Sequence, residues 1–355
     1  MTQNNKLFVN TAFLYILIKI VGTLFALHVF NHFTPLVDSK LYIDGYYIND
    51  GNFRTELIQK ITTLIVELSN PLLTHTIFSL FSGIGIFILS YTMKNKFILL
   101  LLLFPSALIW TSIVGKEAIY YGCFTLILAV WSMQISNVKA RKGFVLHMMT
   151  SILLAVCLIL RPHYTIPLIY LLSTSFVFYT FDSKKIQLIL IAIILVCTAS
   201  LISYLFIMPE NLIARGYGAV DETARASRFA YYNIDLLNPH LIYTKGLLFR
   251  DGIFGIIGPF PSELLIRLEF IPFFIEGITI LLFPIAIGCM FKDTKNVQIY
   301  KKYFYYALVP AILMSIIIHA PFGILNPGTA IRWRVNFELI FYLAPILIYM
   351  KSKNG

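Results

Sequence analysis

The chain has 355 residues, of which 58% are hydrophobic and 13% are charged, and its mean hydropathy is +0.80. A soluble globular domain carries about 25% charged residues, so this composition excludes an ordinary soluble protein. The formal net charge is +11. Because basic residues concentrate in the cytoplasmic loops of membrane proteins, we attribute this excess to topology and expect no nucleic-acid partner.

Ten apolar segments predict membrane-spanning helices. They cover approximately residues 10–33, 71–93, 97–113, 117–136, 143–160, 164–181, 186–208, 271–291, 303–320 and 336–350. A helix needs about 20 mainly apolar residues to cross the bilayer, and these segments are continuous rather than alternating, which excludes a β-barrel. Pro105 and Ser106 interrupt the third segment. We predict an all-α, polytopic transmembrane helix bundle that forms one integral membrane domain over residues 1–355.

The N-terminus, the cysteines and the histidines add smaller expectations. The opening MTQNNK and the apolar stretch after it have no small-residue cleavage site, so we expect an uncleaved first helix. The four cysteines lie in four different apolar segments, so we expect neither a disulfide nor a metal site from them. We expect no cofactor, although a divalent metal at the catalytic site stays open. For His28, His75 and His147, packing with one satisfied hydrogen bond is expected.

The distribution of charged residues predicts which helix ends face the cytoplasm. One side holds 14 of the 28 basic residues and only two acids, Asp182 and Asp293. By the positive-inside rule this side is cytoplasmic. The other, periplasmic side holds 13 basic residues, among them nine of the ten arginines, and 15 of the 17 acids. The remaining base, Lys19, lies within the first predicted helix.

Two larger periplasmic loops are expected at about residues 34–70 and 209–270. The first contains VDSKLYIDGYYINDGNFR and then an amphipathic stretch, TELIQKITTLIVEL. The second is polar in its first half and ends in GIFGIIGPFPSELLIRLEF. The glycines and prolines of that ending predict an interfacial or membrane-dipping segment rather than a full span.

Charged residues beside the short outer connections are candidates for a site. Lys116 and Glu117 stand in mostly apolar sequence, where charges face a partner or a cavity. The carboxylate of Glu117 is either a general base or one half of a neutralised pair. Arg161 ends a helix before Pro162, so its guanidinium lies near the interface, either facing a ligand or anchoring the helix end.

A second arginine group precedes the last predicted helix. Arg332 and Arg334 flank Trp333 in GTAIRWRVNFE. Arginine binds phosphate through two parallel hydrogen bonds, so two arginines at the outer mouth of a bundle suit a diphosphate. Trp333 is either a stacking platform for a sugar or a residue of the interfacial aromatic belt.

The two large loops supply the other candidates. DSKLYIDG contains Asp38 and Asp44, and Asp38 is the candidate for a first-loop catalytic base. The second loop carries Arg215, Arg225 and Arg228 in RGYGAVDETARASRFAYY, which is polar enough to cover a pocket and aromatic enough to hold carbohydrate. Stabilisation of a local helix is the alternative role for these arginines.

Several segments together resemble a pattern in polytopic proteins of bacterial surface-polysaccharide gene clusters. They are FPSALIWTSIVGKEAIYYG, RP at the next outer turn, GIIGPFPSELL…LEFI and GTAIRWRVNFELIFYLAP. That group is similar to Wzy-type O-antigen polymerases and to the GT-C class of membrane glycosyltransferases. The resemblance covers about residues 97–345, with DSKLY as a first-loop counterpart. The R-x10-G outer-loop motif discussed for the polymerases is not matched at Arg215 or Arg228.

The resemblance implies an O-antigen polymerase of the bacterial inner membrane, acting at the periplasmic face. It would transfer a glycan from undecaprenyl diphosphate onto another lipid-linked repeat unit. Arg161, Arg332 and Arg334 would hold the diphosphate, and Glu117 or Asp38 would deprotonate the acceptor hydroxyl. Further substrate contacts are expected from Lys116, Trp333 and the long-loop arginines. Expected partners are the undecaprenyl-diphosphate-linked oligosaccharide, membrane lipid and a chain-length regulator protein.

Three other functions stay open. A GT-C glycosyltransferase would add one sugar from a polyprenyl-phosphate donor and would need a first-loop acid and often a metal. A flippase or transporter would carry charges along a path through the midplane, whereas here we expect only Lys19 within a span. A non-catalytic scaffold for polysaccharide assembly is the third.

Overall fold

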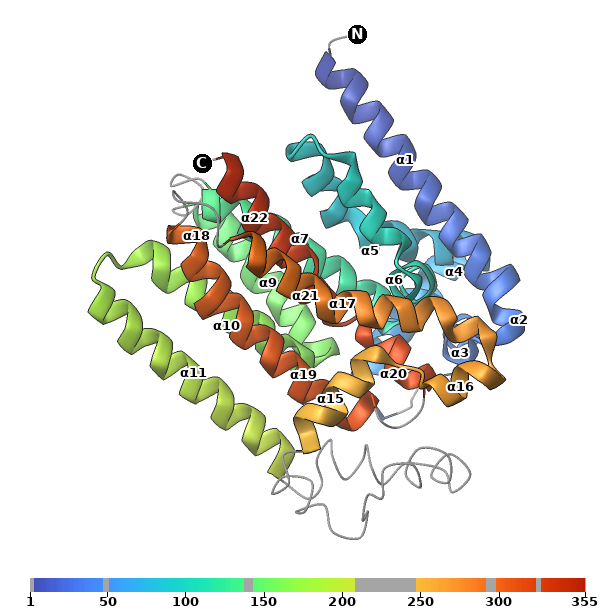
Figure 1. Cartoon of the computed structure of the whole chain (residues 1–355). Helices are drawn as coiled ribbons and strands as arrows, with labels where there is room; N and C mark the ends of the chain where they lie inside the picture. Colours follow the sequence, from blue (N-terminus) through green and yellow to red (C-terminus); the bar gives the residue numbers. More distant parts are fainter. Residues whose placement is uncertain are drawn as a thin grey trace. The chain divides into compact units, whose positions relative to one another are not determined.

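The computed structural model describes residues 3–46, 51–136, 143–207, 247–291, 298–323 and 327–354. Within these ranges the regular elements are helices and no strand occurs (Figure 1). The predicted all-α class is therefore confirmed. Apolar sequence explains it, because a helix pairs its backbone groups within its own segment and needs no neighbouring strand.

Six helices of the described chain are long and apolar enough to cross a membrane, or seven if one bent pair counts as a single span. The six are Asn5–Phe33, Pro71–Thr92, Lys116–Ile135, Lys184–Tyr204, Leu268–Met290 and Tyr300–Ala320. These helices are compatible with a multi-pass membrane protein. The predicted count of about ten spans is not confirmed.

Three other predicted spans are not among these six helices. Residues 97–113 form the 3-10 helix η2 (Lys96–Leu103) and the short α6 (Pro105–Trp110), separated at Phe104, because a residue before proline disfavours the helical conformation. Helix α9 (Phe144–Leu160) has 17 residues, which is marginal for a span. Helix α10 (Pro162–Thr180) begins with Pro-His-Tyr and contains an internal proline, which lowers its hydropathy.

The chain divides into two compact units. The first contains Met1–Met133 and Lys142–Arg161, and the second contains Gln134–Arg141 and Pro162–Gly355. Each unit has its own packed interior. The single integral domain expected over residues 1–355 stays a prediction.

In the first unit, the helix at the N-terminus packs along the next long helix. These are α1 (Gln3–Phe25), which continues through the π-helical turn η1 (Ala26–Phe30) into α2 (Asn31–Phe33), and α5 (Pro71–Thr92) (Figure 1). Asn70 begins α5 by accepting a hydrogen bond from the backbone N–H of Leu73 at 2.8 Å. Pro71 occupies the first turn, where its missing N–H costs nothing.

The first predicted outer loop contains two helices, α3 (Val37–Ile43) and α4 (Phe53–Leu68), which pack against each other. The amphipathic stretch is therefore helical. Asn52 begins α4 by accepting from the N–H of Arg54 at 3.2 Å. The periplasmic location of this loop stays a prediction.

Glycines let α5 approach α7 (Lys116–Ser136) closely within the first unit. A Cβ atom on Gly85 would lie 2.1 Å from the carbonyl carbon of Thr125, and one on Gly122 would lie 2.5 Å from the ring of Phe81. Small residues at helix interfaces are the usual means by which membrane helices bring their backbones together.

The second unit is formed by the remaining helices, which pack among themselves (Figure 1). They are α10, α11 (Lys184–Ile207), α15 (Leu247–Ile257), α16 (Pro261–Ile266), η3 (Leu268–Phe270), α17 (Ile271–Met290), α18 (Gln298–Lys302), η4 (Tyr303–Leu308), α19 (Val309–Gly323), α20 (Pro327–Arg334), α21 (Glu338–Phe341) and α22 (Leu343–Asn354). Helices α15 and α19 approach closely, since a Cβ on Gly252 would lie 2.1 Å from the carbonyl oxygen of Ile316.

The segment predicted to dip into the membrane is broken in the structure. Helix α15 has 11 residues and ends before Gly258, whose φ of +87° suits glycine. The six-residue α16 follows, and neither helix is long enough to span. The position of this segment at the membrane surface stays a prediction.

The last predicted helix, 336–350, lies in the second arm of a bent pair of helices. Helices Gly328–Arg334 and Glu338–Lys353 are bent by 62° relative to each other, which makes them a broken span or a re-entrant segment. Arg334 and Glu338 flank the break. Irregular backbone within a membrane protein must find polar partners in protein or water, so a break of this kind marks a place to look for a site.

Candidate functional site

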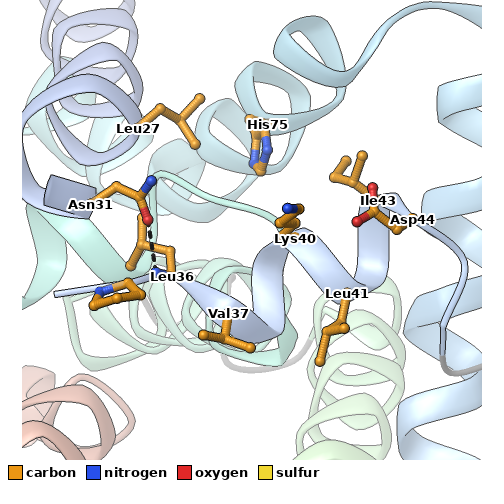
Figure 2. A pocket seen from close by; sticks show the side chains of 10 residues that line it. Leu27, Asn31, Leu36, Val37, Lys40, Leu41, Ile43, Asp44 and His75 are labelled. Carbon is orange, nitrogen blue, oxygen red and sulfur yellow. Dashed lines mark hydrogen bonds between the residues drawn. The ribbon is translucent and has the colours of Figure 1, made fainter.

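A cavity of about 780 Å³ lies between the end of the first long helix and the first-loop helix α3 (Figure 2). Apolar side chains from Leu27, Leu36, Val37 and Leu41 form much of its wall. The lining residues belong to the first unit. An apolar wall with a few polar groups is the usual character of a small-molecule site.

Three titratable side chains line this cavity. Lys40 and Asp44 are four residues apart on α3 and at its end, and His75 comes from α5 (Figure 2). Lys40 and Asp44 are exposed. No ion pair between them occurs in the described part of the chain, so both charges are accessible to a ligand.

His75 is oriented by the backbone of another segment. Its Nδ1 accepts a hydrogen bond from the N–H of Val114 at 3.0 Å. A neutral imidazole that accepts at Nδ1 carries its proton at Nε2, which then serves as a donor. For His75, the expectation of packing with one satisfied hydrogen bond is confirmed. The sequence did not predict that His75 also lines a cavity.

The irregular segment 111–115, between α6 and α7, is buried and held from two sides. Lys19, fully buried in α1, donates to Thr111 Oγ1 at 2.9 Å and to Ser112 Oγ at 3.4 Å. From α5, His75 binds the N–H of Val114. Because hydrogen bonds strengthen in a low-dielectric interior, these contacts hold the segment that leads into Lys116 and Glu117.

The structure brings two of the predicted site residues together. The guanidinium of Arg161, at the end of α9, donates to Glu117 Oε1 at the start of α7, and only 8% of Arg161 and 2% of Glu117 are exposed. Lys116 Nζ donates to Thr55 Oγ1 of α4 at 2.7 Å. This geometry favours the neutralised-pair interpretation of Glu117, since the Arg161 guanidinium already binds its carboxylate.

A second buried ion pair lies in the second unit. Arg334 is 0% exposed, and its guanidinium donates to Glu276 Oε2 of α17 at 2.6 Å and to the carbonyl oxygen of Ile256 at 2.7 Å. Gly277 makes room for it, because a Cβ there would lie 2.7 Å from Arg334 Nη1. The guanidinium thus joins α20 to α17 and to the end of α15.

Glu338 adds a second carboxylate to this cluster. It is 0% exposed, and its carboxyl group interacts with Tyr342 and Glu276. Glu276 and Arg334 lie within electrostatic reach. Two carboxylates therefore share one guanidinium. Because an uncompensated charge is costly to bury, the cluster needs a proton or a cation to balance it.

The other residues predicted for the site do not form a single cluster in the described part of the chain. Arg332 and Trp333 are half-buried on α20, and the Trp333 ring lies 6.3 Å from that of His163. Asp38 is half-buried in the first turn of α3 and does not line the cavity. Arg215, Arg225 and Arg228 fall in residues 208–246, outside the described residues. Arg161 and Arg334 belong to different units, so a shared diphosphate site stays a prediction.

No protein-family model matches the chain, and neither a curated protein nor a solved structure shows a significant match. The resemblance to O-antigen polymerases and GT-C glycosyltransferases therefore stays a prediction. In the described residues no group of three or more His, Cys, Asp or Glu side chains could hold a metal ion, and the use of a metal stays open.

The expectation that Lys19 is the one charged residue within a span is wrong. Glu276 lies inside the candidate span Leu268–Met290, and Glu338 begins the second arm of the bent pair. An isolated acid in IPFFIEGITILLFP was a sufficient signal, because an ionisable residue in an apolar segment needs a partner. Asp44 was noted in the sequence, but nothing in DSKLYIDG distinguished it from Asp38.

Proposed function

We propose that this chain is a membrane glycosyltransferase whose donor is a sugar or glycan on a polyprenyl phosphate or diphosphate. The observation that carries the proposal is the first-unit cavity, in which Lys40, Asp44 and His75 surround an otherwise largely apolar space. The cation suits a phosphate and the carboxylate suits an acceptor hydroxyl. The apolar wall suits the prenyl chain.

The chemistry follows from these groups. Asp44 removes the proton of the acceptor hydroxyl, whose oxygen forms a bond to the anomeric carbon of the donor. The bond from that carbon to the phosphate oxygen breaks, and its electron pair stays on the phosphate. Lys40 and the Nε2–H of His75 stabilise the negative charge that develops there. No step requires Glu117 as a base, and its pair with Arg161 fixes the start of α7.

The proposal keeps both glycosyltransferase forms suggested by the sequence. An O-antigen polymerase takes an undecaprenyl-diphosphate-linked oligosaccharide and extends a chain, whereas a GT-C enzyme adds one sugar. The first-loop acid in a cavity favours the GT-C arrangement, and the outer-segment resemblance favours the polymerase. Product length separates them. A ladder of repeats made by the purified protein from lipid-linked oligosaccharide identifies a polymerase, and a single added unit identifies the GT-C form.

The decisive variant is Asp44→Asn, with Asp38→Asn as its matched control on the same helix. Glycan transfer is measured in proteoliposomes with a polyprenyl-linked donor. Since a general base contributes roughly 10²–10⁴-fold, Asp44→Asn is expected to lose at least about a hundredfold in rate while Asp38→Asn stays within a few fold. Loss in Asp38→Asn with normal rates in Asp44→Asn would move the base to Asp38 and refute the role of this cavity.

One observation favours a transporter as the second candidate. Glu276, Arg334 and Glu338 are buried in helices that could span, and a 62° break separates Arg334 from Glu338. Broken helices with buried charges are typical of transport sites. Translocation of a lipid-linked glycan by proteoliposomes that form no glycosidic bond, and its loss in Glu276→Gln, would replace the first proposal with this one.

A further inference from the structure

A second cavity, of about 420 Å³, lies in the second unit among α10, α11, α18 and η4. Its lining combines three lysines with apolar and aromatic side chains. The polar members are Lys184, Gln187, Gln298, Lys301 and Lys302. Phe178, Leu188, Ile191 and Tyr306 complete it. The glycosyl-transfer proposal uses none of these residues.

The three lysines make this cavity strongly basic. In the described part of the chain no carboxylate lies within ion-pair distance of Lys184, Lys301 or Lys302. The hydrogen bond that Lys302 Nζ donates is to a neutral group, Gln187 Oε1, at 3.5 Å. Three like charges that converge, with no described carboxylate within ion-pair distance, repel one another, so an anion bound among them relieves that repulsion.

The wall of the cavity changes from charged to apolar along one face of α11. Lys184, Gln187, Leu188 and Ile191 follow at spacings of three and four residues, which places them on one side of the helix. Ile191 lies about 10 Å further along the axis than Lys184, at 1.5 Å per residue. Helix α11 is a candidate span, so its lysine end lies at the membrane surface and the apolar end lies deeper.

We propose that this cavity binds a phosphate group, and that the phosphate is the headgroup of an anionic phospholipid. The lysines take the headgroup, and an acyl chain follows Leu188 and Ile191 into the bilayer. Leu188 is 55% exposed, as expected for a residue that contacts a lipid chain rather than protein. The charge distribution predicts that this end faces the cytoplasm, where anionic lipids attract basic clusters.

Native mass spectrometry of the full chain in detergent tests the proposal, with phosphatidylglycerol as probe and phosphatidylcholine as reference. The variant Lys184→Gln/Lys301→Gln/Lys302→Gln is compared with Lys6→Gln/Lys96→Gln/Lys185→Gln. The control removes three exposed lysines from the same predicted side, none of which lines the cavity. We expect the cavity variant to bind phosphatidylglycerol at least about tenfold more weakly, because each lysine near the membrane surface raises the affinity for an anionic lipid several fold. The control variant is expected to bind like the unchanged protein.

Two further outcomes decide the source and the site. Soluble glycerol 3-phosphate that displaces phosphatidylglycerol at equal concentration would overturn the lipid assignment and identify a soluble phosphate as the ligand. Equal phosphatidylglycerol binding by the two triple variants would overturn the site altogether. Leu188→Gln, which leaves the lysines in place, is expected to weaken phosphatidylglycerol binding without changing glycerol 3-phosphate binding.

Discussion

At the scale of single residues, the described chain contains a few buried ionisable side chains that are held by specific partners. Arg161 with Glu117 and Arg334 with Glu276 are ion pairs, whereas the buried side-chain nitrogen of Lys19 is held by hydroxyl groups. Taking charges out of water is expensive, so such groups tolerate the loss of one partner poorly. They therefore fix helix ends to one another more strictly than apolar contacts would.

The first-unit pair gives a stability prediction. Arg161→Gln leaves the buried carboxylate of Glu117 without its guanidinium, so we expect a loss of about 3–5 kcal/mol, and the double variant Arg161→Gln/Glu117→Gln should recover part of it. Thermal unfolding in detergent measures both. The control is Arg267→Gln, because the pair of Arg267 with Glu269 is 40% and 24% exposed and should contribute less than about 1 kcal/mol. Equal losses in Arg161→Gln and Arg267→Gln would contradict a special role for the buried pair.

At the scale of helices, two devices recur. Glycines allow close approach, as between α5 and α7 and between α15 and α19. Breaks in helices place polar groups, as at segment 111–115 and between α20 and α21. The two features are related. Backbone that leaves a helix needs hydrogen-bond donors and acceptors nearby, and closely packed helices bring such groups within reach.

Glycine substitutions test the close contact of α15 and α19. Gly252→Ala would place a methyl group against the backbone of α19, which cannot move without shifting the helix, so we expect a loss of about 1–3 kcal/mol. Gly288→Ala is the control, since its Cβ would meet only the ring of Phe304 at 3.1 Å, and that ring can turn aside. Both changes gain the same helix propensity. Thermal unfolding should separate them, and a stable Gly252→Ala protein would mean that the contact is looser than described.

At the scale of the whole molecule, apolar surface faces outward over long helices. An 18-residue apolar stretch of α11 is only 22% buried, and Phe13 on α1 is 67% exposed. Exposed apolar surface on this scale is compatible with a protein whose helices face lipid. The charges at the helix ends then predict the orientation, because lysine and arginine in short loops tend to be retained in the cytoplasm.

Cysteine labelling tests this orientation. In a chain whose four native cysteines are replaced by serine, a cysteine at Glu67, at the end of α4, is expected to react with a membrane-impermeant maleimide in intact spheroplasts. A cysteine at Lys185, at the start of α11, is expected to react only after permeabilisation. Both positions are exposed, so access rather than burial decides the result. The opposite pattern would reverse the predicted topology and would place the proposed glycosyl-transfer cavity in the cytoplasm.

Much of the fold class could be predicted from sequence because the relevant forces act locally. Long apolar segments predict helices, since only a helix satisfies its own backbone in lipid. The asparagines at 52 and 70 stand where α4 and α5 begin, because their side chains accept the first free N–H groups. Prolines also explain why residues 97–113 do not form one span.

The partners of the buried charges could not be predicted from local sequence, because each pair joins residues that are distant in the chain. Glu117 and Arg161 are 44 residues apart, and Glu276 and Arg334 are 58 apart. Sequence alone identified Arg161, Arg334 and Glu117 as candidates, since charges in apolar surroundings need a reason. It did not show that each arginine is already paired, nor that Asp44 rather than Asp38 lines the cavity. Those facts depend on how the helices pack, and packing decides which charge meets which partner.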